Sequence, residues 1–136
     1  MSGTYAFEEA VIGILSAVAH ADGRLADEEL AWWARIRARH PLFRDLPPSQ
    51  LSPLFDRAQA ALAAQPWAEA VTEWAHHIPK AEAELVYRLA VELQFVDGES
   101  TRQESQVTVH IAHALGLSAE RSTHLFEIAL HARLGD

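Results

Sequence analysis

Apolar residues recur along this chain at intervals of three and four, with polar residues between them. Because an α-helix has 3.6 residues per turn, this pattern predicts amphipathic helices rather than β-strands. The first predicted helix covers about 5–21. Its apolar face consists of Phe7, Val11, Ile14, Leu15 and Val18. Six more helices are predicted at about 27–40, 53–65, 67–77, 80–96, 101–115 and 118–134.

Proline and glycine mark the ends of several predicted helices. Four prolines lie within 41–53, which predicts a loop with no more than a short helical turn. Gly116 predicts a left-handed end for the sixth helix, and Ser118 predicts an N-cap for the seventh. The sequence shows no linker and no low-complexity segment. We therefore predict an all-α fold, a single compact bundle of about seven helices over residues 1–136.

Composition narrows the classes of function. The chain has 136 residues, no Cys and a net charge of −8. Thiolate metal sites, Cys nucleophiles and disulfides are excluded, and the negative charge argues against a nucleic-acid partner. The apolar stretch 11–21 is too short to span a bilayer and follows two Glu residues, which does not fit a signal peptide. We expect a soluble cytoplasmic protein without membrane insertion.

One local motif occurs twice, 75 residues apart, at 21–29 and 96–104. In each copy an Asp-Gly pair follows one predicted helix, and a Glu seven residues after the Asp lies inside the next helix. Residues 1–30 carry six acidic residues and one Arg, and residues 81–104 carry six acidic residues and two Arg. The motif therefore predicts two acidic helix-turn-helix corners, related by an internal repeat with the middle helices inserted between the copies.

The four carboxylates of the corners continue the apolar faces of their helices, and so point towards the interior or its rim. They belong to Asp22, Glu29, Asp97 and Glu104. Two carboxylates about 5 Å apart repel by roughly 3 kcal/mol at an effective dielectric of 20. Backbone N–H groups, an Arg, a shared proton or a bound cation would relieve that repulsion. Because the ligands are oxygen atoms, a cation would be Ca²⁺, Mg²⁺ or Mn²⁺ rather than a soft metal.

A second interpretation of the same residues is helix capping. Thr101 and Glu104 have the spacing of a capping box, and Asp-Gly is an ordinary turn pair. The first copy has Ala26 in place of Thr101, so its box is incomplete. A normal EF-hand does not fit, since its first and third ligand positions would be apolar or His residues. Capping alone and capping combined with cation or partner binding both remain open.

An Ala-Asp-Gly-x-hydrophobic-x-x-x-Glu corner, repeated in an acidic all-helical chain that ends on Gly116-Leu117-Ser118 and a last helix, resembles the TerB-like family. That family includes the tellurite-resistance protein TerB and the N-terminal domain of the DjlA co-chaperone. The resemblance implies a seven-helix bundle, a link to tellurite or chemical-stress resistance, and a metal-related role without an established reaction. Its acidic positions correspond to Asp22, Glu29, Asp97 and Glu104.

The His residues give weaker signals. One Glu73-x-x-His76 motif is too little for a di-iron site, which needs two. His110 and His113 lie away from the apolar face of their helix and are predicted to be solvated. A solvent face is also predicted along the last helix, formed by Glu120, His124, Glu127 and His131.

Motifs of hydrolases and a phosphate-binding Gly-rich loop do not occur in the sequence. We therefore predict a non-enzymatic module that binds a divalent cation or an unidentified protein partner through the two corners. The alternative is a purely structural interaction or scaffold domain in which the acids act as helix caps.

Overall fold

Six α-helices make up most of the part of the chain that the computed structural model describes, residues 6–20, 48–94 and 102–134, and no strand occurs in these ranges. The helices are α1 (Ala6–His20), α3 (Pro48–Ala64), α4 (Trp67–Ala75), α5 (Lys80–Gln94), α6 (Arg102–Ala114) and α7 (Ala119–Leu134). The predicted all-α class is confirmed. The helix predicted at 27–40 lies outside the described residues.

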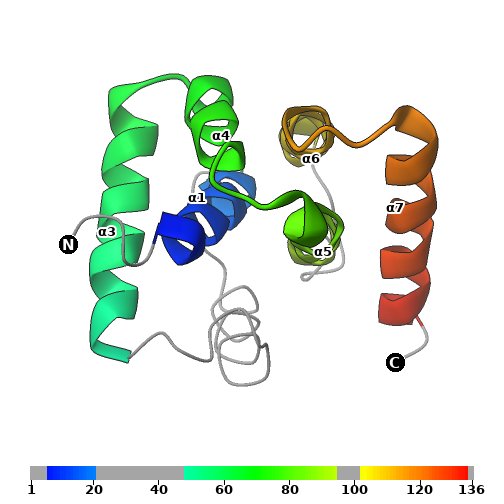
Figure 1. Cartoon of the computed structure of the whole chain (residues 1–136), viewed down its shortest axis with the longest axis horizontal. Coiled ribbons are helices and arrows are strands. Elements are labelled where there is room, and N and C mark those ends of the chain that lie inside the picture. Colours follow the sequence, from blue (N-terminus) through cyan, green and yellow to red (C-terminus); the bar gives the residue numbers. More distant parts are fainter. Residues whose placement is uncertain (1–5, 21–47, 95–101, 135–136) are drawn as a thin grey trace.

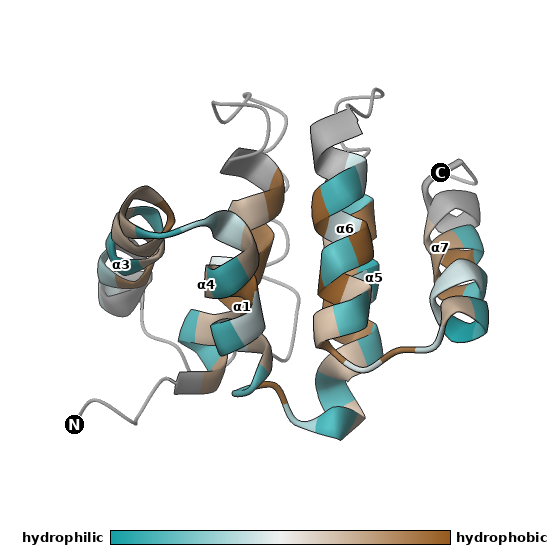
Figure 2. Ribbon diagram, turned by 90° about the horizontal axis from the view of Figure 1, so that it is seen from above, coloured by the Kyte–Doolittle hydropathy of each residue, from teal (hydrophilic) through white to brown (hydrophobic). Residues whose placement is uncertain are grey.

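Helix α1 lies at the centre of the described bundle and packs against α3, α4, α5 and α6 (Figure 1). Helices α3 and α7 lie across the bundle at its two opposite edges, α3 against α1 and α7 against α5. Figure 2 shows that α1 and α5 run in the same direction and that α6 runs back beside α5. The arrangement places the ends of α1 and α5 on one side of the molecule, where α6 begins.

The central position of α1 follows from its two different faces. Every residue from Ala10 to Val18 is buried, although the periodic pattern predicted only one buried face. Large residues form the predicted face, and the opposite face carries small residues that let a neighbouring helix approach closely. At Gly13 the backbone of α1 lies against the indole ring of Trp74 in α4, which leaves no room for a Cβ atom. Helix α1 is therefore a core helix rather than an amphipathic surface helix.

The predicted loop over 41–53 is wrong in its second half, because α3 begins at Pro48 and contains Pro53. Proline is tolerated at the first helical position, whose N–H has no helical partner. Pro53, in the second turn, removes only the bond to the carbonyl of Ser49. Packing in the core offsets that loss, because three apolar residues of α3 are buried against it: Leu54, Ala58 and Leu62.

The turn between α6 and α7 has the hydrogen bonds that its sequence predicted. Gly116 has φ of 80°, and the N–H of Leu117 donates to the carbonyl of Ala112 at 3.0 Å. These are features of a Schellman motif, which ends a helix at a left-handed residue. The N–H of Arg121 donates to Oγ of Ser118 at 3.0 Å, so Ser118 is the N-cap of α7. Both predictions are confirmed.

Helix α7 is tied to α5 by an ion pair in which Arg121 donates from Nε and Nη2 to the two carboxylate oxygens of Glu84, each at 2.7 Å. Both side chains are exposed. The hydrogen bond from Arg121 lowers the pKa of Glu84 below its ordinary value of 4.5, and the positive charge of Arg121 adds to this effect. The folded state therefore favours the ionised carboxylate.

This ion pair predicts a small, pH-dependent contribution to stability. A lowered pKa stabilises the fold above the unfolded value of 4.5, and the contribution disappears as pH falls through the folded pKa. We expect Glu84→Gln to lower the melting temperature slightly at about pH 7 and not at about pH 3. Thermal denaturation across this pH range tests the prediction. Glu127→Gln, on the outer face of α7, is the control. A difference in melting temperature between Glu84→Gln and the wild-type protein that persists at the lowest pH would contradict this role of the ion pair.

Candidate functional site

Three helix ends meet on one side of the bundle, the upper side in Figure 2. Helix α1 ends at His20, α5 ends at Gln94 and α6 begins at Arg102. The two predicted corners start from these ends, since Asp22 follows His20 by two residues and Asp97 follows Gln94 by three. A common site requires that the two corners start on the same side of the bundle, and these helix ends meet that requirement.

The structure describes the side chain of none of the four predicted site residues. Asp22, Glu29 and Asp97 lie outside the described residues, and Glu104 lies in the first turn of α6 with its side chain outside them. The distances between the four carboxylates therefore stay a prediction. In the described ranges no group of three or more His, Asp or Glu side chains could hold a metal ion.

The backbone adds its own charge to this side of the molecule. The last turn of a helix exposes carbonyl oxygens without helical partners, and the helix dipole places partial negative charge there. Two such ends, those of α1 and α5, are directed to the side from which the acidic corners extend. The N-terminus of α6 contributes partial positive charge and offsets some of it. Of the three described helix ends on this side, two therefore carry partial negative charge and one carries partial positive charge.

A buried polar bridge joins the end of α5 to the start of α6. Gln94, the last residue of α5, is 1 % exposed, and Thr108 is 3 % exposed. The side-chain amide of Gln94 donates to Oγ of Ser105 at 3.0 Å and accepts from Oγ1 of Thr108 at 2.9 Å. Nothing in the sequence marks Gln94 as buried, because a Gln at a helix end is usually exposed.

His110 is not solvated as predicted but joins α6 to α4. Its Nε2 lies 3.0 Å from the carbonyl oxygen of Ala68 and 3.1 Å from Oγ1 of Thr72. A carbonyl only accepts, so Nε2 carries the hydrogen and donates. The imidazole ring also meets the ring of Trp67 edge to face at 5.4 Å. His113, one turn later, is exposed as predicted.

A depression of about 650 Å³ lies beside His110 between α4 and α6. It is lined by Trp67, Ser105, Gln106, Val109, His110 and His113. Val109 is 70 % exposed, and the exposed surface of the depression is mainly apolar. Ligand sites combine such surface with a few converging polar groups that fix orientation. Here the Nε2 of His110 is already bonded to the carbonyl of Ala68, so this nitrogen serves the contact between α6 and α4.

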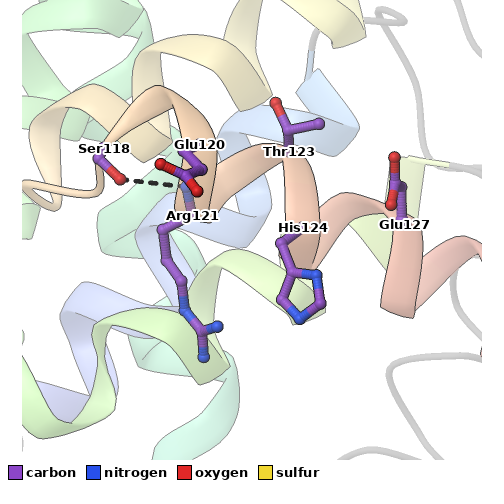
Figure 3. A pocket seen from close by; sticks show the side chains of 6 residues that line it. All are labelled: Ser118, Glu120, Arg121, Thr123, His124 and Glu127. Carbon is purple, nitrogen blue, oxygen red and sulfur yellow. Dashed lines mark hydrogen bonds between the residues drawn. The ribbon is translucent and has the colours of Figure 1, made fainter.

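The outer face of α7 carries a second, polar depression of about 460 Å³ (Figure 3). Glu120, His124 and Glu127 are exposed, which confirms the predicted solvent face for these three residues. His131 lies outside the side chains that are described. In the view of Figure 3 the His124 ring and the Glu127 carboxylate extend in different directions rather than towards a common point. These side chains therefore do not form a ligand set.

A comparison with known protein families shows which family this chain resembles. A family described as tellurite resistance protein TerB matches residues 8–126, most of the chain. The chain belongs to the TerB family. The matched range contains both corners and reaches into α7, so the TerB resemblance stated from the sequence is confirmed. Searches of curated proteins and of solved structures gave no match.

Membership connects this all-helical chain to a family associated with tellurite resistance. That residues 1–136 form a single domain stays a prediction. None of the helices in the described ranges has the length and apolar character needed to cross a bilayer.

Proposed function

We propose that this TerB protein is a non-enzymatic module of the tellurite or chemical-stress response that binds a divalent cation. The ligands would be the carboxylates of Asp22, Glu29, Asp97 and Glu104. One observation carries the proposal: α1 and α5 end on the same side of the bundle, where α6 begins. Corners that are 75 residues apart in the sequence thus start from neighbouring helix ends.

The chemistry of these groups favours a hard cation. Carboxylate oxygens and backbone carbonyls at helix C-termini are ligands suited to Ca²⁺, Mg²⁺ or Mn²⁺. A bound ion would offset the repulsion among the carboxylates and would link two distant parts of the chain. Because such an ion binds the folded state and not the unfolded chain, stability should rise with its concentration.

Calorimetric titration with Ca²⁺, Mg²⁺, Mn²⁺ and Zn²⁺, combined with thermal denaturation, tests the proposal. We expect at least one of the first three ions to release heat and to raise the melting temperature. Asp22→Asn and Asp97→Asn should each weaken binding by about tenfold or more, since each removes a charged ligand. Glu120→Gln removes one negative charge from the exposed face of α7 and should leave the affinity unchanged.

Absence of heat and of thermal stabilisation with every ion would overturn cation binding. Equal weakening by Asp97→Asn and Glu120→Gln would show that only the net charge matters. If Glu104→Gln lowers stability in a protein that binds no ion, the acids act as helix caps and the scaffold function holds instead. Loss of a captured protein partner on Asp97→Asn, without ion binding, would assign the corners to a protein interface.

A further inference from the structure

The imidazole of His110 uses only one of its two nitrogens to hold the fold. Nε2 lies 3.0 Å from the carbonyl oxygen of Ala68 and 3.1 Å from Oγ1 of Thr72. The hydroxyl of Thr72 donates its own hydrogen to the carbonyl of Ala68 over 2.8 Å. Both neighbours of Nε2 therefore act as acceptors, so Nε2 carries the hydrogen. In the neutral ring Nδ1 then has no hydrogen and presents a lone pair.

This lone pair is held in place but has no protein partner in the described part of the chain. Both hydrogen bonds of the His110 ring run from Nε2, and the two nitrogens of an imidazole face in different directions. The ring of Trp67 meets the imidazole edge to face at 5.4 Å and fixes it further. The half-buried His110 therefore offers one unused acceptor in a defined orientation.

His110 is part of the wall of the depression between α4 and α6, which has a volume of about 650 Å³. Small-molecule sites typically measure roughly 300–1,000 Å³ and combine apolar surface with a few polar groups. Here Trp67 supplies an aromatic surface and Val109 an exposed aliphatic one. The depression thus combines surface suited to a flat apolar ring with a single oriented acceptor.

The groups around the depression favour one class of ligand. Imidazole nitrogens bind Zn²⁺ or Cu²⁺, but no group of three or more metal-ligating side chains occurs in the described ranges. An anion would meet the Nδ1 lone pair and a chain of net charge −8. A neutral aromatic molecule with an N–H or O–H donor matches both the acceptor and the apolar surface.

We propose that the depression between α4 and α6 binds a small neutral aromatic molecule of the indole or phenol type, whose N–H or O–H donates to Nδ1 of His110. Its ring packs on Trp67 and Val109, and the hydrogen bond to Nδ1 sets its orientation. The wall contains none of the four carboxylates of the corners, so this site is independent of cation binding.

Indole and N-methylindole provide a matched pair of probes, because they differ in the N–H donor. Titration of the labelled protein, followed by nitrogen NMR at about pH 8, where an ordinary imidazole is neutral, gives both affinities and the Nδ1 resonance of His110. We expect indole to bind about fivefold more tightly than N-methylindole, which corresponds to one hydrogen bond. Indole alone should shift the Nδ1 resonance, and other shifts should be confined to residues around the depression.

Three substitutions separate the hydrogen bond from the apolar contact. His110→Gln places an amide N–H where Nε2 stands, which keeps a donor for Ala68 and removes Nδ1. We expect this variant to bind the two probes equally. Val109→Ala should weaken both probes alike and keep the preference for indole. His124→Gln, on the exposed face of α7, should change neither affinity.

Equal affinities of the wild-type protein for indole and N-methylindole, or an Nδ1 resonance that indole does not shift, would overturn the proposal. Both results come from the wild-type protein, so they do not depend on the folding of any variant. A response to neither probe would also overturn it. Signals around Val109 that then move with protein concentration would assign the face to a second copy of the chain, and signals that move with Zn²⁺ alone would assign it to a metal.

Discussion

Replacing Gly13 with alanine is expected to destabilise the protein by about 2 kcal/mol, although alanine forms helices better than glycine. A Cβ at this position would lie well inside 3.0 Å from three atoms of the Trp74 ring, a separation that real Cβ atoms essentially never show. Because the contacting atoms belong to a rigid ring, either α4 must shift or the whole indole of Trp74 must move. Thermal denaturation should show a decrease of about 5 to 10 °C in melting temperature.

A second substitution, Trp74→Leu, provides the control for this prediction. If the clash with Trp74 causes the loss, then Gly13→Ala should cost much less in a Trp74→Leu background, where the ring is absent. A double-mutant cycle measures this coupling directly. An increase in the melting temperature of the single Gly13→Ala variant would show that helix propensity outweighs the contact, and would contradict close packing of α1 on α4.

Local sequence patterns were enough to predict most helix boundaries of the described fold. Gly116 and Ser118 each act through bonds to residues within five positions, so their roles can be derived without knowledge of the tertiary structure. Pro53 was misleading for a related reason. Its local preference predicts a break, but the burial of Leu54 and Ala58 extends the helix through it. Tertiary packing decided the outcome.

Contacts between distant segments could not be predicted in this way. His110 bonds to Ala68 and Thr72, which precede it by about forty residues, and the sequence around it gives no sign of this. The bridge at Gln94 similarly depends on a helix that returns beside α5. The repeat predicted two acidic corners, and the helices that precede them, α1 and α5, end on one side of the bundle. Where the carboxylates of Asp22 and Asp97 lie relative to one another stays a prediction.

Helix α1 shows most clearly why a periodic pattern understates burial. The periodic pattern predicts a single apolar face for α1, because the opposite face consists largely of small residues with little hydrophobic signal. Ala10, Gly13 and Ala17 lie on that face, and all three are buried. Small residues allow short distances between helix axes, so the absence of large side chains indicated close packing here rather than exposure to solvent. The structure consequently makes α1 a central element of the described core.

Replacing Ile12 with alanine should therefore cost about 3 kcal/mol, as is typical for a large apolar side chain removed from a core. Ile12 is outside the face that the periodic pattern predicted, yet it is 0 % exposed. Removing its three outer carbons would leave a cavity that helices on several sides of α1 cannot all fill. Urea denaturation of the variant, compared with the wild-type protein, measures the change in free energy of unfolding.

Val109→Ala on α6 is the matched control, because it also shortens a β-branched residue within a helix but at a position that is 70 % exposed. Its effect should stay within about 0.5 kcal/mol. A loss at Ile12 as small as that at Val109 would mean that α1 has a solvent-exposed face, and α1 would not be the central helix of the bundle. A large difference between the two variants would instead support a buried α1, whose end is the starting point of the first acidic corner.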